Sequence, residues 1–192
     1  EELVAGMDAA DGDVDFPAVR ARKAPVLRAA ARRLLDSRAH PLFAAWCTWR
    51  DAHPWIHDAA LFGELRESHG GQPWWTWPAD ERDRDPETLA GLRRVHGPAT
   101  DERAALAFLF DHQWARLQEV ADAAGVLVVG DLPIYVSRDS ADAWVDRSLF
   151  EFDEQGLPAR VAGVPPDDFS ATGQLWGNPL YDWERMASDG YA

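Results

Sequence analysis

The stretch that decides the fold class is VLVVGDLPIYV, which runs from Val126 to Val136. It is a nearly continuous apolar run rich in β-branched residues, and it follows directly on a helical pattern that ends at Gly125. A run of this kind after a helix is typical of a strand buried on both faces of a parallel sheet. The sequence therefore predicts an α/β fold. A parallel strand needs parallel neighbours, and because we find no second convincing one, we expect them outside this chain.

The helix before this strand has the clearest boundaries in the sequence. Thr100 is a good N-cap, Asp101 and Glu102 suit the positive end of the helix dipole, and Gly125 fits the position just after the helix. Its predicted core-facing stripe consists of apolar residues at helical spacing: Leu106, Leu109, Phe110, Trp114, Leu117, Val120, Ala121 and Ala124.

Upstream, apolar residues recur at helical spacing in several shorter segments. We expect helices from Ala24 to about residue 36, from Pro41 onward, over 58–68 and from Pro86 to about residue 96, and an irregular segment over residues 1–22. Trp46, Trp49 and Trp114 have the spacing of core residues, whereas the connector QPWWTWP holds three tryptophans whose role is ambiguous. The sequence thus predicts a mainly helical part over residues 1–99.

Residues 100–192 form the second predicted part, which is α/β. After the apolar run, DSADAW has the capping pattern of a short helix, and LFEFDEQGLPARV predicts a hairpin that turns at Asp153–Gly156.

Composition excludes several classes of function. The 192 residues carry a formal net charge of −14, which disfavours binding to nucleic acid or to an anionic membrane surface. The longest apolar run contains Asp131 and is too short to span a bilayer. Cys47 is the single cysteine, which excludes an intrachain disulfide and fits a reducing cytoplasm, and no signal peptide is visible. The chain does not begin with Met and resembles an internal piece of a longer protein.

Two places favour a binding role. Asp131 lies inside the predicted buried strand, where a carboxylate is costly unless it is paired, so either backbone amides satisfy it or it faces a ligand. The second place is GVPPDDFSATGQLWGNPLYDW, from Gly163 to Trp183, which reads as a loop stiffened by prolines. Asp167, Gln174 and Asn178 offer groups that match sugar hydroxyls, and the side chains of Phe169 and Trp176 offer flat apolar faces. The alternative is a loop that packs its aromatics on its own domain.

Other chemical motifs are weak. His53 and His57 are four residues apart, but Pro54 between them argues against a regular helix, and we predict no metal site. The sequence has no P-loop, no GxGxxG after a strand and no GxSxG elbow, and we predict no cofactor. The residues by themselves indicate a cytoplasmic α/β segment whose aromatic and polar loop suits a neutral, hydroxyl-rich ligand.

Three stretches closely resemble one enzyme family. They are DHQWARLQEVADAAGVLVVGD, GDLPIYVSRDSADAW and VAGVPPDDFSATGQLWGNPLYDW, and the similar family is that of the 4-α-glucanotransferases, or amylomaltases, of glycoside hydrolase family 77. HPWIHDAALFGELRE and QPWWTWP resemble the helical region of the same family. The resemblance is colinear and covers most of the chain from about residue 15, and the two C-terminal stretches are its most specific part.

The resemblance implies a segment of a (β/α)8 barrel with an inserted helical subdomain. It further implies transfer of α-1,4-glucan segments to the 4-hydroxyl of an acceptor by a retaining double displacement, which needs two carboxyl groups about 5–5.5 Å apart. GDLPIYV would be the third barrel strand, with Asp131 at the rim of the sugar site. Asp167, Phe169, Gln174 and Trp176, together with Asn178, would contact or position glucan. The two catalytic carboxylates are expected C-terminal to residue 192, so none of these residues is catalytic.

One residue departs from the family pattern, and two other classes of protein stay open. The family usually has a tyrosine where this chain has Asp168, which leaves the glucan preference open. The first rival is a non-catalytic segment that binds α-glucan. The second is a structural or interaction domain whose exposed tryptophans meet a protein partner.

Overall fold

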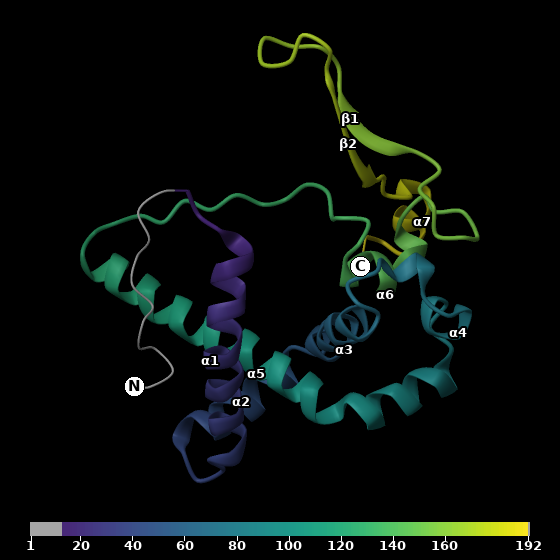
Figure 1. Ribbon diagram of the computed structural model, residues 1–192. Helices are drawn as coiled ribbons and strands as arrows, with labels where there is room; N and C mark the ends of the chain where they lie inside the picture. The colour runs from purple at the N-terminus through teal and green to yellow at the C-terminus, as the bar shows by residue number, and fades with distance from the viewer. Residues whose placement is uncertain (1–12, 192) are drawn as a thin grey trace. The chain divides into compact units, whose positions relative to one another are not determined.

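The computed structural model describes residues 13–191 (Figure 1). By their internal contacts the residues form two compact units. The first runs to His57 and continues over Pro98–Val128, and the second comprises Asp58–Gly97 and the chain from Val129 onward. Helix α3 (Trp55–Ser68) and helix α5 (Pro86–Ala123) each contribute residues to both units. These units do not test the predicted division of the chain between residues 99 and 100, which stays a prediction.

The first unit is helical. It holds α1 (Phe16–Asp36), α2 (Pro41–Ala52) and the second part of α5. Pro41 is the first residue of α2, as the sequence predicted, because a proline there removes an N–H that has no partner in the helix. Trp49 donates its indole N–H to Asp111 Oδ2 at 2.8 Å, which ties α2 to α5. The buried side chains of this core are Ala31, Leu34, Trp46, Ala105 and Phe108.

Two predicted helix boundaries are wrong. Helix α1 begins at Phe16, because Asp15 caps it with a hydrogen bond from Ala18 N to Oδ1 at 3.0 Å. The irregular segment predicted up to residue 22 is therefore shorter, and its residues 1–12 lie outside the described part. Thr100 is not an N-cap, since α5 continues through Pro98 as one helix of 38 residues. A proline removes one helical hydrogen bond, and the remaining bonds and the packing on either side outweigh that loss.

The predicted end of α5 is confirmed. Gly125 has φ +70°, and Val126 N donates to Ala121 O at 2.9 Å, which is the closing bond of a Schellman motif.

The predicted buried strand over 126–136 is wrong for this structure. Leu127 is 88% exposed, Val129 is 91% exposed, and the segment forms no strand. A strand needs a neighbour to pair its backbone, and within residues 13–191 the regular sheet consists of two other strands. Part of the apolar stripe on α5 is also exposed, at Phe110, Trp114, Leu117 and Val120.

The second unit combines short helices with a two-stranded sheet. Its elements are the main part of α3, the 3₁₀-helix η1 (Trp74–Thr76), α4 (Ala79–Arg82), the first part of α5, α6 (Ala141–Val145), the 3₁₀-helix η2 (Arg147–Leu149), β1 (Val161–Val164), β2 (Gln174–Pro179) and α7 (Trp183–Ser188). The predicted helices at 58–68 and in DSADAW are both present, and Ser140 caps the second of them. The described chain is therefore helix-rich, with one antiparallel sheet.

The tryptophans of the connector belong to the core of this unit. Trp74 and Trp77 are buried, and Trp74 donates its indole N–H to Arg138 O at 2.7 Å. Trp144 likewise donates to Glu81 O at 3.1 Å. The role that the sequence left ambiguous is thus structural for these two connector tryptophans. The buried cluster consists of Leu61, Phe62, Leu65, Trp74, Trp77, Leu89 and Trp144.

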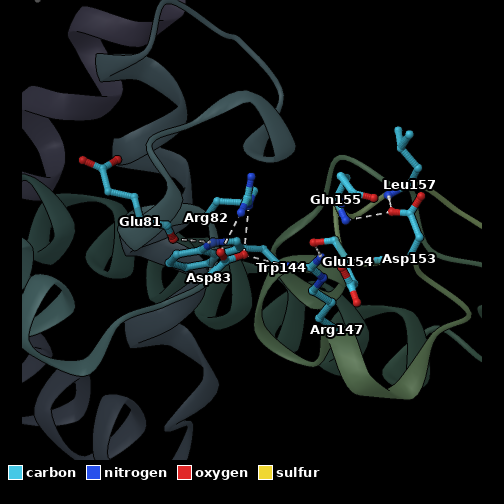
Figure 2. A network of polar contacts seen from close by, with 9 residues as sticks. All are labelled: Glu81, Arg82, Asp83, Trp144, Arg147, Asp153, Glu154, Gln155 and Leu157. Carbon is cyan, nitrogen blue, oxygen red and sulfur yellow. Dashed lines mark hydrogen bonds and ion pairs between the residues drawn. The ribbon is translucent and has the colours of Figure 1, made fainter.

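A polar network beside this core holds the turn at Asp153–Gly156 (Figure 2). Arg147 donates to Asp83 Oδ1 at 2.9 Å and to the backbone carbonyls of Asp153 and Glu154 at 3.0 and 2.8 Å. Asp153 Oδ1 accepts from two backbone N–H groups further along the turn. The predicted turn is confirmed, with Phe152 paired to Pro158 across it.

The described residues include no helix that is both long and apolar enough to cross a membrane.

Candidate functional site

The stretch from Gly163 to Trp183 was predicted as a loop, and much of it is a β-hairpin. Strands β1 and β2 run antiparallel, with Gly163 opposite Leu175 and Val164 opposite Gln174. A side-chain carbon at Gly163 would lie 2.6 Å from Gln174 O, so only glycine permits this approach. The strands escaped sequence reasoning because prolines and glycines interrupt their alternation. In Figure 1 the hairpin projects away from α6 and α7, which belong to the same unit.

Asp167 builds the tip of this hairpin. Its Oδ1 accepts hydrogen bonds from Phe169 N at 2.9 Å and Ser170 N at 2.7 Å. Ser170 in turn donates its hydroxyl to Gly173 O at 2.8 Å, and Gly173 has φ +72°. These bonds fix the backbone on both sides of Phe169, whose ring is 95% exposed. Asp167 therefore holds the tip of the hairpin through hydrogen bonds to the backbone.

Gln174 and Trp176 lie together on β2. The indole N–H of Trp176 donates to Gln174 Oε1 at 3.0 Å, because residues two apart on a strand share a face. The indole also meets Tyr135 edge to face, with ring centroids 6.2 Å apart and an interplanar angle of 62°. Trp176 is nevertheless 46% exposed, so the ring keeps a free surface.

Asn178 fastens β2 to the segment that precedes α6. Its side-chain amide donates to Val136 O at 2.7 Å, across 42 positions of the chain. Gly177, just before it, has φ +78°, a backbone conformation that glycine adopts without strain. The structure thus brings Gln174, Trp176 and Asn178 onto one short strand beside Tyr135.

Asp131 lies four residues before Tyr135, within the run 126–136 that forms no strand. The carboxylate was predicted inside a buried strand, and it is exposed. Its role at a binding site stays a prediction.

Sequence reasoning missed Tyr135 and Tyr181. Their rings stack at 6.2 Å with an angle of 17°, and Tyr181 also contacts Phe150 at 5.2 Å and Trp183 at 5.3 Å between centroids. In the sequence Tyr135 is one residue of the apolar run Val126–Val136 and carries no further signal. The pairing of residues 46 positions apart leaves no local pattern, so only the fold reveals it.

Arg160, which directly precedes β1, is paired with a carboxylate. Arg160 donates Nε to Glu151 Oε2 at 2.7 Å, and this hydrogen bond holds the pKa of the Glu151 carboxyl below its usual value. A lowered pKa keeps the group ionised, which does not suit a general acid.

His53, one of the two histidines with possible metal-ligand spacing, lies against Trp49 with Nδ1 2.6 Å from Trp49 O. Among residues 13–191 no three His, Cys, Asp or Glu side chains gather as metal ligands would.

A stiff hairpin with exposed aromatic faces and amide groups is the kind of surface that suits a sugar ring. The family model for 4-alpha-glucanotransferase matches residues 1–192. The chain is 38% identical over 182 residues to the 4-alpha-glucanotransferase of Thermus thermophilus, covering 94% of this chain and 36% of that one. It is also 38% identical to the chloroplastic/amyloplastic enzyme of Oryza sativa subsp. japonica, covering 93% and 30%.

A solved structure extends the comparison to the fold. The amylomaltase of Streptococcus agalactiae, in complex with acarbose, superposes with a TM-score of 0.86 at 32% identity, over 95% of this chain and 38% of that one. The chain therefore belongs to the 4-alpha-glucanotransferase family, glycoside hydrolase family 77. It spans about a third of the length of the curated relatives it matches.

Proposed function

We propose that the full-length protein is a glycosyltransferase that moves α-1,4-glucan segments to the 4-hydroxyl of an acceptor glucan or glucose. The substrates would be maltooligosaccharides and longer α-1,4-glucans, as in starch, maltodextrin or glycogen metabolism in the cytoplasm. The reaction would proceed by a retaining double displacement. The single observation in this chain that supports the proposal is the β1–β2 hairpin. The family model matches the whole of the chain that contains it.

In this proposal the hairpin covers the glucan groove. Phe169 at the tip and Trp176 on β2 supply exposed faces, on which the apolar side of a pyranose ring can pack. Asp167 holds the backbone beside Phe169, Gln174 holds the indole of Trp176, and Asn178 holds β2. A solved relative in complex with acarbose supports a saccharide as the ligand.

The exposed apolar run at 126–136 has its own place in the proposal. In the full-length protein it would be the third strand of a (β/α)8 barrel, paired on both sides. The exposure of Leu127 and Val129 supports this, since large apolar side chains in such a row stabilise a fold when they are covered. Asp131 would then lie on that strand, at the rim of the sugar site.

The bond-breaking groups would lie elsewhere in the protein. A retaining mechanism needs a carboxylate nucleophile and a carboxylic acid about 5–5.5 Å apart, and we place both after residue 192. This chain by itself would therefore be inactive. Asp168, which stands beside Phe169 on the exposed tip where the family usually has tyrosine, would alter stacking at that point and with it the preferred glucan.

The test is transfer from maltotriose. The full-length protein is expected to convert maltotriose to glucose and a ladder of longer oligosaccharides, which chromatography resolves. The 192-residue chain alone, at the same molar concentration, is expected to give no product above the blank. Turnover by that chain alone would overturn the assignment of the catalytic groups to later residues.

The same samples separate the other two classes of protein. A full-length protein that binds maltoheptaose, seen as a change in tryptophan fluorescence, but forms no product would be a non-catalytic glucan binder. Absence of both binding and transfer would favour a structural or interaction domain and would contradict the proposal.

A further inference from the structure

We infer that Tyr135 is a positioning residue, which with Gln174 holds the indole of Trp176 in the orientation that glucan binding requires. The inference rests on the proposed function and goes beyond it, because Tyr135 was not among the predicted binding residues. Trp176 is the residue that would touch the sugar, and Tyr135 would act through it.

The indole of Trp176 is held at two separate points. Its N–H is engaged by Gln174 Oε1 at 3.0 Å, which fixes the rotation of the ring. The ring of Tyr135 meets the indole edge to face, with the ring centroids 6.2 Å apart and an angle of 62° between the ring planes. This geometry lies within the range of favourable aromatic pairs. With its N–H used internally, the ring offers the ligand its remaining apolar surface.

Tyr135 is itself held by a second aromatic contact. Tyr181 stacks on the ring of Tyr135, with the centroids 6.2 Å apart and an interplanar angle of 17°. The ring of Phe150 packs against Tyr181 with the centroids 5.2 Å apart. Phe150 and Tyr181 are also paired through the backbone, with Glu151 N donating to Leu180 O at 2.9 Å. The row from Phe150 through Tyr181 and Tyr135 to Trp176 is therefore continuous. A ring at the end of a supported row has fewer orientations to lose when it binds.

The residue after Tyr135 fixes the strand that carries Trp176. Val136 O accepts from the Asn178 side-chain amide at 2.7 Å. The step Tyr135–Val136 thus contacts β2 twice, once through a ring and once through a carbonyl. The hydrogen bond to Val136 O holds the strand in place, and the ring of Tyr135 orients the indole of Trp176. Together these contacts order the binding surface before the ligand binds. Such preparation lowers the entropic cost of binding.

The experiment compares variants of the full-length protein in maltotriose transfer and in maltoheptaose binding. Tyr135→Leu removes the ring, and we expect KM and the maltoheptaose Kd to rise about 3- to 10-fold, the effect of losing one aromatic pair. The turnover number kcat is expected to stay within about twofold, as when binding is lost equally from ground and transition states. Tyr135→Phe keeps the ring and is the matched control, expected to behave as the parent.

A double substitution separates positioning from a general structural effect. In a Trp176→Leu background Tyr135→Leu is expected to change neither KM nor Kd further, because no indole remains to be held. An equal rise in both backgrounds would overturn the inference. If Tyr135→Leu does not fold, Tyr135→Met, which also removes the ring but keeps a large apolar side chain, replaces it, with Tyr135→Phe again as the control.

The inference and the proposed function can fail separately. A raised KM in Trp176→Leu with an unchanged KM in Tyr135→Leu would overturn the inference alone. An unchanged KM in Trp176→Leu would overturn the proposed role of the hairpin and the inference with it.

Discussion

Gly156 lies where the turn of the second unit meets the buried ring of Trp74. It has φ +76°, and a Cβ there would lie 2.7 Å from Cη2 of that indole. Gly156→Ala is expected to lower the free energy of unfolding by about 2–4 kcal/mol, through left-handed strain and crowding of a packed core. Urea unfolding of the full-length protein, followed by tryptophan fluorescence, measures it.

The control for this change is Gly71→Ala. Gly71 has φ +79°, and nothing lies within 4 Å of an added Cβ, so only the strain of about 1–2 kcal/mol applies. Equal losses at the two positions would show that the contact with Trp74 costs nothing.

Asp58 is expected to make the stability of the second unit depend on pH. Burial alone would raise its pKa, but hydrogen bonds and charges from Arg93 and Arg84, at 2.7 and 2.9 Å, lower the pKa below 3.8. A lowered folded-state pKa gives stability that is present above pH 3.8 and is lost as the pH falls through the folded value. Asp58→Asn is expected to cost about 1–2 kcal/mol at pH 7 and progressively less below pH 4.

Denaturant unfolding between pH 3 and pH 7 measures this dependence. The matched control is Asp189→Asn, since Asp189 pairs with Arg185 at 3.5 Å and both side chains are 54% exposed. That pair is expected to contribute less than about 1 kcal/mol. A cost at Asp58 that stays constant down to pH 3 would contradict the assigned pKa direction.

Single residues also mark the limit of sequence reasoning. The composition of the stretch Gly163–Trp183 indicated a stiff segment, and Asp167 indeed holds its tip through two backbone bonds. The partners of Asn178 and Trp176 could not be predicted, because Val136 and Tyr135 lie about 40 positions away. Side chains that the sequence assigned to a ligand are thus partly engaged in holding the hairpin.

At the scale of elements, helix α5 contains a residue type that disfavours the helical conformation. Pro98 lies within it, although proline is about 3 kcal/mol less favourable than alanine in a helix interior. Pro98→Ala is expected to raise the free energy of unfolding by about 1–3 kcal/mol, because it restores a helical hydrogen bond. Thermal or urea unfolding of the full-length protein checks this.

Pro86→Ala is the control, since Pro86 is the first residue of the same helix, where proline is tolerated. It is expected to change stability by less than about 0.5 kcal/mol. A loss of stability in Pro98→Ala would contradict the account, because it would mean that the packing of α5 needs the proline.

Several elements whose signals are local were predicted correctly, although the predicted N-cap at Thr100 was wrong. The cap at Ser140, the proline at the start of α2 and the turn at Asp153–Gly156 all depend on neighbouring residues, and all are present. The run at 126–136 shows the opposite case, because a strand exists only beside a partner. The described residues offer it none, so its apolar side chains are exposed.

At the scale of the whole molecule, family membership and local geometry support each other. The chain belongs to the 4-alpha-glucanotransferases over its whole length, and it covers about a third of its curated relatives. Its second unit presents a braced hairpin with two exposed rings, Phe169 and Trp176. We propose that this hairpin binds glucan and that residues outside the chain cleave the bond.

The most direct test of that assignment is transfer of glucan to labelled glucose by the full-length protein, with Phe169→Leu/Trp176→Leu beside the parent. The account predicts labelled maltooligosaccharides from the parent, and from the variant a KM for the donor glucan raised about tenfold or more, with kcat within a few-fold. Equal KM values for parent and variant would contradict the assignment of glucan binding to the hairpin, and absence of labelled product from the parent would contradict transferase activity itself.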